Sequence, residues 1–140
     1  MKPPAVTLAF VQLMASSVKL RGAVDGALRR RCSLSLSEKE LLMLLRNRGG
    51  RSRMADISGG LRLSTGGATK MVGRLVKAEL VSRGKSAEDQ RVVEVTLTEE
   101  GKARLDAAMP VMLAVVREQL APLTATEVNQ LNAIMEKLNG

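Results

Sequence analysis

The spacing of the apolar residues changes once along this chain, and that change limits the folds open to it. In most of the chain they recur every three to four positions, as in a helix that buries one face. From Leu80 to Leu97 the spacing becomes two, and Val93 and Val95 share one side, as in a strand. After Thr98 the helical spacing returns. The pattern predicts a mainly helical protein with one small β-hairpin.

Helix start and stop signals divide the helical part into six segments. Ser37 and Glu40 have the spacing of a capping box, as do Thr124 and Glu127, and a proline pair precedes the first segment. Ser64 and Thr98 are expected to be N-caps. We therefore expect helices over 5–31, 41–47, 51–60, 65–78, 99–120 and 125–138, with strands over 80–83 and 91–97.

The composition excludes several kinds of functional site. Among the 140 residues there is no His, Trp or Tyr, and only one Phe and one Cys. A catalytic triad with His, an imidazole zinc site and an aromatic platform for unpaired bases are all excluded. No phosphate-binding loop or general base stands out either, so we expect no enzyme activity, no catalytic or metal-binding residue, and no cofactor.

The start of the chain gives little support to export. The segment before Ala15 carries one basic residue, Lys2, and Gln12 interrupts its apolar run. No apolar stretch approaches the roughly 18 residues that span a bilayer. We therefore expect a cytoplasmic protein that does not enter the membrane.

Positive charge is concentrated in the middle of the chain. The net charge is +8, and residues 46–91 hold 11 basic against four acidic residues, whereas residues 92–140 are net negative. Such a basic segment is typical of proteins that bind a polyanion. A solvated surface that keeps the protein soluble would give the same charge, so both interpretations stay open on charge alone.

The predicted helix at 65–78 has two contrasting faces. Ala68, Met71, Val72 and Leu75 form an apolar face, and the opposite face is short, polar and cationic. Hydroxyl and cationic groups suit a helix that lies in a DNA major groove, where base edges and phosphates are in reach. The outward face consists of Thr65, Thr69, Lys70, Gly73 and Arg74.

Two helices joined by a tight turn and followed by a two-stranded hairpin form a winged helix-turn-helix. The motifs along this segment resemble those of the MarR family of transcriptional regulators. The most specific is Asp89-x-Arg91, followed by Leu97-Thr98 and Gly101. The resemblance covers the whole chain. Its other motifs are Leu63-Ser64, Ala68-Thr69-Lys70-Met71-Val72, Arg74-Leu75, Leu80-Val81, Arg83 and Leu123-Thr124.

The resemblance implies a homodimeric repressor that binds a double-stranded DNA operator. It divides the chain into helical dimerisation segments, 1–35 with 99–140, and a DNA-binding winged helix-turn-helix, 36–98. The fourth helix would enter the major groove and the wing the minor groove, with Arg91 as the wing arginine and Asp89 as its orienting partner. The expected DNA-binding residues are Ser64, Thr65, Thr69, Lys70, Arg74, Lys85, Asp89 and Arg91.

A small aromatic or anionic effector is a second implication. Thr69, Met71 and Arg83 match family positions that contact an aromatic carboxylate, although a phosphate contact or support of the wing also suits Arg83. The family often has glycine where this chain has Glu79, so we expect the fourth helix to end without a left-handed residue.

Two alternatives to an effector-controlled repressor stay open. Arginines at positions 29–31 lie next to Cys32 in sequence and would lower a thiol pKa, so a thiol-based redox regulator is the first alternative. The second is a winged-helix architectural or interaction protein that binds DNA without an effector and with little sequence preference.

Overall fold

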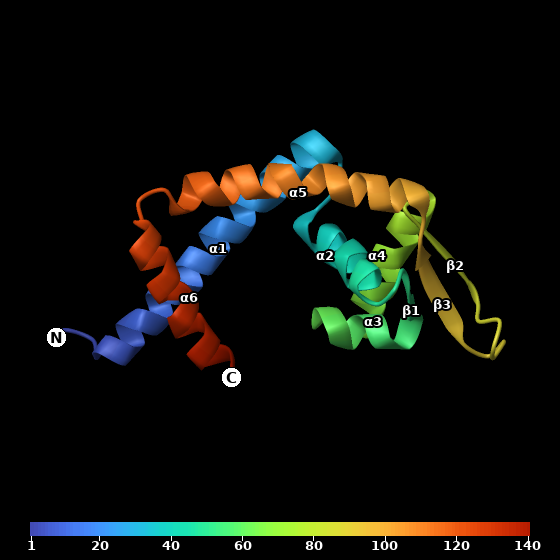
Figure 1. The fold of residues 1–140 in the computed structure, drawn as a ribbon. Helices are drawn as coiled ribbons and strands as arrows, with labels where there is room; N and C mark the ends of the chain where they lie inside the picture. The colour runs from blue at the N-terminus through green and yellow to red at the C-terminus, as the bar shows by residue number, and fades with distance from the viewer.

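The computed structural model describes all 140 residues, which form an arch (Figure 1). The long helices α1 and α5 lie against each other across the top of the arch, and both termini lie at the end away from the hairpin. The helices are α1 (Ala5–Cys32), α2 (Leu36–Asn47), α3 (Met54–Leu61), α4 (Thr65–Lys77), α5 (Glu99–Leu120) and α6 (Ala125–Asn139). The strands are β1 (Arg51–Arg53), β2 (Val81–Lys85) and β3 (Val93–Leu97).

The predicted fold class is confirmed, and three of the expected helix starts are formed as the sequence indicates. The side chains of Ser64 and Thr98 accept hydrogen bonds from backbone amides of α4 and α5. Thr124 and Glu127 form a reciprocal capping box at α6. These starts are predictable because the cap and the amide that it binds lie within three residues of each other.

The predicted second helix begins too late, because the sequence places its start at residue 41 whereas α2 begins at Leu36. The capping box is formed by Ser35 and Glu38, and not by Ser37 and Glu40. The first helical residue, Leu36, is buried and donates its amide to the Asp25 carboxylate of α1 at 2.8 Å. A contact from outside the segment therefore selects one of two overlapping boxes.

The predicted helix over 51–60 is also wrong at its start, because its first three residues form β1. This strand pairs antiparallel with β3, with Arg53 opposite Glu94, and the sheet order is β1-β3-β2. The wing is therefore part of a three-stranded sheet, whereas the sequence predicts a two-stranded hairpin. A strand of three residues shows too few alternations to reveal itself, and its partner lies about 40 residues away along the chain.

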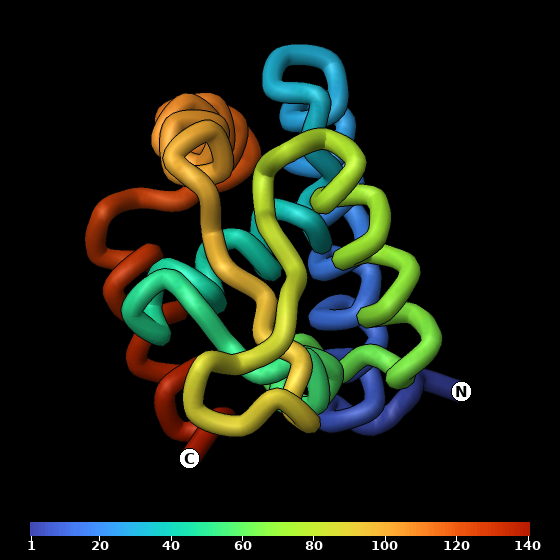
Figure 2. Tube along the Cα trace, turned by 90° about the vertical axis from the view of Figure 1, so that its right-hand side faces the viewer, coloured from blue at the N-terminus to red at the C-terminus, as the bar shows by residue number.

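One hydrophobic core holds the sheet, α2, α4 and the middle of the arch together. It contains 21 buried residues, among them Leu28, Leu41, Leu75, Val95 and Leu105. Figure 2 looks nearly along α5 and shows the hairpin descending from the start of that helix, with α4 beside it. The core thus fixes the position of α4 relative to the wing.

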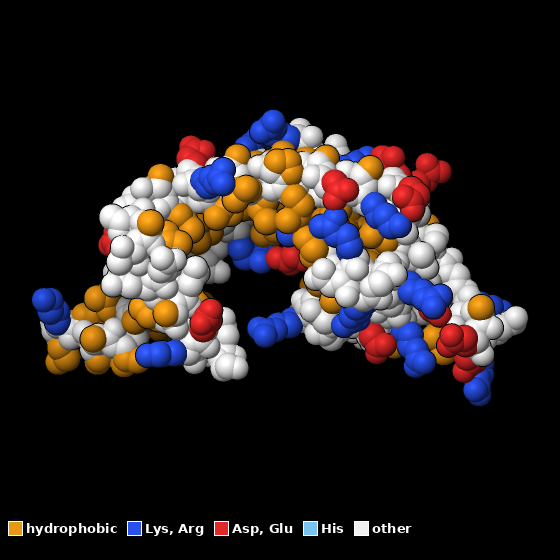
Figure 3. All heavy atoms as spheres, viewed as in Figure 1, with side chains coloured by type: hydrophobic (Ala, Val, Ile, Leu, Met, Phe, Trp, Pro, Cys, Tyr) orange, Lys and Arg blue, Asp and Glu red, His pale blue; other side chains and the backbone are white.

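The terminal helices lie largely outside this core. α6 has no buried residue, and the buried residues of α1 begin at Val24. The exposed apolar side chains of α1 include Val6, Phe10 and Val18. Figure 3 shows apolar side chains at the protruding start of this helix. No helix of the structure is both long enough and apolar enough to cross a membrane.

Candidate nucleic-acid interface

The helix α4 presents the two faces that its sequence predicts. Ala68, Met71, Val72 and Leu75 are buried in the core. Ser64 begins the helix from an extended conformation, and its Oγ accepts the amide of Gly67 at 3.0 Å. Because this cap and this packing fix both the start and the rotation of α4, its remaining face is held toward solvent.

The outward face of α4 carries the predicted contact residues. Thr65, Thr69, Lys70 and Arg74 are all exposed. Thr69 Oγ1 donates a hydrogen bond to the Thr65 carbonyl at 2.9 Å, so its lone pairs remain free to accept one. The face therefore offers a hydroxyl acceptor beside cationic donors, as base edges and phosphates require.

The two cations of this face differ in their surroundings. Lys70 forms no ion pair, whereas Arg74 Nε lies 3.8 Å from the Glu38 carboxylate at the start of α2. This pair is more than half exposed on the arginine side, so its contribution to stability is small. It nevertheless directs Arg74 toward α2, so of the two cations on this face Lys70 is the one without an ion-pair partner.

The predicted Asp89–Arg91 pair forms at the tip of the wing. The Asp89 carboxylate accepts from the backbone amide of Arg91 at 3.0 Å and from Nε and Nη2 of its guanidinium at 3.2 and 3.3 Å. These bonds hold the pKa of the Asp89 carboxyl below its usual value. The side chain of Arg91 remains 91% exposed. Asp89 therefore fixes the orientation of the Arg91 guanidinium, while most of the Arg91 side chain stays open to solvent.

The wing tip itself is a compact turn. Its backbone closes through a hydrogen bond from the Ser86 amide to the Val92 carbonyl at 2.8 Å, and Ser86 is buried. Lys85, the last residue of β2, is exposed beside it. The tip therefore presents Lys85 and Arg91 from a structured turn, although the strands end and begin two residues later than predicted.

The end of α4 corrects the prediction for Glu79. Glu79 adopts the left-handed conformation with φ of 62°, so the helix ends as it would with glycine, at a steric cost. Its carbonyl accepts a hydrogen bond from the Thr98 hydroxyl at 2.7 Å. A bond to a residue 19 positions away maintains a conformation that the local sequence disfavours, and sequence patterns do not reveal such a bond.

The predicted effector residues do not converge in the single chain. Thr69 and Met71 lie on opposite faces of α4, one exposed and one buried. Arg83 is exposed on β2. Two open surface cavities, of about 540 and 410 Å³, are lined by other residues. The effector site stays a prediction, because the three residues do not form a common site within one chain.

Cys32 lies at the end of α1 and is buried. Its Sγ lies 3.8 Å from the Ala107 carbonyl, and Arg104 donates to the Cys32 carbonyl at 3.1 Å. The thiol is therefore packed between α1 and α5, and the side chains of its basic neighbours Arg29, Arg30 and Arg31 are exposed. This environment fits a structural cysteine better than a reactive one.

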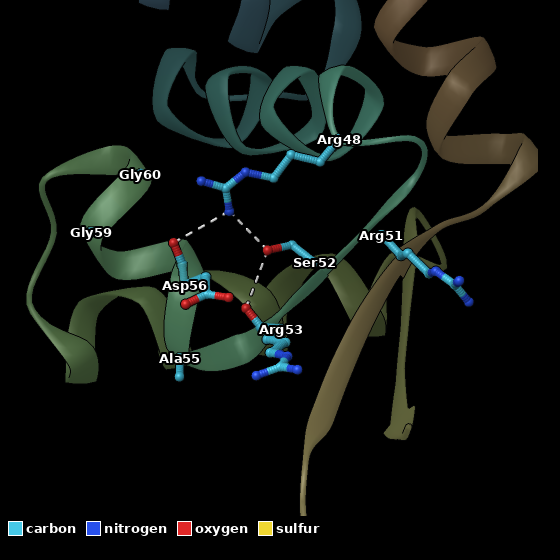
Figure 4. A pocket seen from close by; sticks show the side chains of 8 residues that line it. All are labelled: Arg48, Arg51, Ser52, Arg53, Ala55, Asp56, Gly59 and Gly60. Carbon is cyan, nitrogen blue, oxygen red and sulfur yellow. Dashed lines mark hydrogen bonds between the residues drawn. The ribbon is translucent and has the colours of Figure 1, made fainter. Parts of the chain in front are cut away.

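A second basic cluster, not predicted from the sequence, is formed by the arginine that follows α2 and by two arginines of β1. Arg48, Arg51 and Arg53 line the larger of the two cavities, which opens beside α3 (Figure 4). All three fall within the basic middle of the chain, and that charge was the only signal in the sequence. Their proximity depends on the β1–β3 pairing, which no local pattern predicts.

Comparisons with known proteins show that the central part of the chain is similar to one family. The model of the MarR family matches residues 34–93, which contain α2 to α4, β1, β2 and the wing tip. Over 89 residues, the chain is 27% identical to the HTH-type transcriptional repressor MdtR of Bacillus subtilis. That match covers 64% of this chain and 57% of MdtR, so it spans little more than half of that relative.

Solved structures share the fold over nearly the whole chain. The MarR family regulator Sco3205 of Streptomyces coelicolor, in complex with DNA, superposes with a TM-score of 0.83 at 23% identity, covering 99% of this chain and 88% of Sco3205. The organohalide-sensing regulator RdhR, in its 2,4-dichlorophenol-bound form, gives a TM-score of 0.85 at 20% identity, with 98% and 80% covered. At these identities the likeness establishes the fold.

Proposed function

Because residues 34–93 of this chain form a MarR family domain, we propose that the protein binds double-stranded DNA at specific sequences and regulates transcription. The observation that carries the proposal is the pairing of two exposed elements: the polar face of α4 and a wing whose Arg91 is held by Asp89. A helix face of hydroxyls and cations suits the major groove, and an arginine suits the narrower minor groove. The proposal contains no catalytic step and no cofactor.

The proposed assembly is a homodimer formed by residues 1–35 and 99–140, with residues 36–98 as its DNA-binding part. Phe10 and Val18 of α1 are 62% and 75% exposed, and Ile134 and Leu138 of α6 are 58% and 64% exposed. An apolar surface of this extent marks an interaction site in a protein, and a second copy is the simplest partner. Figure 3 shows apolar side chains at this end of the arch and along its underside.

A repressor relieved by a small aromatic or anionic effector is the regulatory mode that we propose. Support comes from relatives alone: MdtR is a transcriptional repressor, and RdhR binds 2,4-dichlorophenol. Thr69, Met71 and Arg83 are the proposed contacts, and their separation within one chain means that the site would need side chains from other elements or from a second copy. A cytoplasmic location follows from the proposed action on DNA.

Footprinting of the dimer on DNA tests the proposal directly. Two copies of α4 related by a twofold axis are expected to protect two half-sites about 10 bp apart, centre to centre. A single asymmetric protected site shorter than ~8 bp would contradict the dimeric arrangement. Sedimentation of the same sample gives the oligomeric state independently, and a purely monomeric chain would contradict it as well.

A further inference from the structure

A basic cavity lies on the DNA-binding part of the chain, outside α4 and the wing tip. Its volume is about 540 Å³, and it opens between the end of α2, β1 and α3 (Figure 4). Three arginines, Arg48, Arg51 and Arg53, are among its lining residues, against the single acidic residue Asp56. Such a surplus of positive charge attracts an anion.

Two of these arginines are already engaged within the protein. Arg48 Nη1 donates to Ser52 Oγ at 2.9 Å and to the Asp56 carbonyl at 3.4 Å, and so connects α2, β1 and α3. Gly60 leaves room for this guanidinium, since a Cβ there would lie 2.9 Å from Arg48 Nη2. Arg51 Nε lies 4.0 Å from the Glu94 carboxylate of β3.

Arg53 is the arginine of the cluster that is free. It is exposed, and its side chain makes no hydrogen bond and no ion pair. Figure 4 shows its guanidinium on the side of β1 away from Arg48. As the last residue of β1 and the N-cap of α3, Arg53 is held by strand pairing on one side and by a helix on the other. Its backbone is therefore fixed while its side chain is unpartnered.

Arg53 also belongs to the same face as the wing arginine. Its strand partner is Glu94 on β3, the strand that follows the wing tip. The pKa of Asp89 is lowered chiefly by its hydrogen bonds from Arg91, and the nearby charge of Arg53 lowers it further. In Figure 1 the start of α3 and the wing tip both lie at the lower edge of the DNA-binding part.

We propose that Arg53 binds a backbone phosphate of the DNA, beside the groove that the wing enters. The inference rests on the proposed function and adds a contact that is independent of α4. A guanidinium pairs well with a phosphodiester through two parallel hydrogen bonds, and such contacts position a protein on DNA without reading its sequence. Arg48 and Arg51 maintain a positive potential around the site from their fixed positions.

The test compares Arg53→Gln with Arg51→Gln on DNA carrying the footprinted site. Both changes remove one positive charge from β1, but Arg51 already has a carboxylate partner. The affinity is measured against salt concentration for the wild type, for both variants and for Arg53→Lys. Each lost phosphate contact is expected to reduce the slope of log affinity against log salt by about 0.9 per protomer.

The expected result is a reduced slope for Arg53→Gln and a slope near that of the wild type for Arg51→Gln. Arg53→Lys keeps the charge and should give a slope between those of the wild type and Arg53→Gln. Equal losses for both Gln variants, or no loss for Arg53→Gln, would overturn the assignment, because net charge alone would then explain the effect or Arg53 would not reach DNA. In both cases the wild-type affinity for DNA is unaffected, so the proposed function would stand.

A second measurement locates the contact on the DNA. Neutral methylphosphonate groups are placed at single backbone positions of the site, one at a time. At one position in each half-site the wild type is expected to lose affinity while Arg53→Gln is not, since that variant no longer uses the phosphate. If every substitution weakens both proteins equally, the proposal is wrong. A wild-type chain that does not bind DNA at all overturns the proposed function and this site together.

Discussion

The hydroxyl of Thr98 donates to the carbonyl of Glu79 at 2.7 Å, across the base of the wing. The same Thr98 Oγ accepts the amide of Gly101 and so caps α5. The end of α4 and the start of α5 are therefore joined through one side chain. Because β2 begins just after Glu79 and β3 ends just before Thr98, this connection sets the direction in which the wing extends from α4 and α5.

Replacing Glu79 by Gly is expected to stabilise the protein. Glu79 has φ of 62°, a conformation that costs a non-glycine residue about 1 kcal/mol or more and costs glycine almost nothing. Urea denaturation should therefore give a free energy of unfolding about 1 kcal/mol higher for Glu79→Gly. The matched control is Ala78→Gly, where φ is −81° and glycine should destabilise. Equal destabilisation by both changes would contradict the strained helix end.

Replacing Gly101 by Ala is expected to destabilise the connection between α5 and the wing. A Cβ at this position would clash with the Leu80 carbonyl and lie 2.8 Å from Leu97 Cδ1. Since the first obstacle is backbone, relief requires α5 to shift, and we expect a loss of about 2–3 kcal/mol. Gly22→Ala in α1 is the control, because nothing lies within 4 Å of its Cβ. Thermal or urea unfolding checks both, and a neutral Gly101→Ala would show that the approach is looser than described.

Acid is expected to weaken the anchor of Arg91. Hydrogen bonds from Arg91 lower the pKa of Asp89 from its ordinary value of 3.8, so the pair is intact above that value. The stabilisation is lost as the pH falls through the lowered pKa, where the carboxylate becomes protonated. In an NMR titration the Asp89 carboxyl should show a midpoint below 3.8, and Arg91→Gln should raise it. A midpoint that Arg91→Gln does not move would mean that the pair does not form in solution.

A charge placed on α6 is expected to weaken the dimer. Ile134 is 58% exposed in the single chain, and we propose that a second copy covers it. Ile134→Lys would bury an unpaired charge in that interface, so sedimentation should show dissociation at concentrations where the wild type is dimeric. Asn132→Lys adds the same charge at an exposed polar position of the same helix. If Ile134→Lys is as dimeric as Asn132→Lys, α6 does not contribute an apolar contact to the interface.

What the sequence predicts here is what depends on near neighbours in the chain. The caps at Ser64, Thr98 and Thr124 involve residues three positions apart, and the Asp89–Arg91 pair involves residues two positions apart. The helical spacing of apolar residues also locates α4 and its buried face. Both elements of the candidate interface could therefore be identified from local patterns.

What it does not predict depends on contacts between distant segments. The Asp25 carboxylate on α1 selects Leu36 as the first residue of α2, and the β1–β3 pairing turns Arg51–Arg53 from helix into strand. The same pairing brings Arg53 near the wing, and the Thr98 hydroxyl supports the left-handed Glu79. Because such contacts join residues 11 to about 40 positions apart, spacing along the chain contains no direct signal of them.

The central claim is that this chain recognises a particular DNA sequence, and the affinity ratio between two duplexes tests it most directly. One duplex carries the footprinted site and the other the same bases in scrambled order, and both are titrated at one salt concentration. A sequence-specific regulator should bind the first at least about 10³ times more tightly. Arg91→Ala should weaken both complexes and leave the ratio nearly unchanged, since a minor-groove arginine reads mainly charge and width. A wild-type ratio near one would contradict the account and favour an architectural protein.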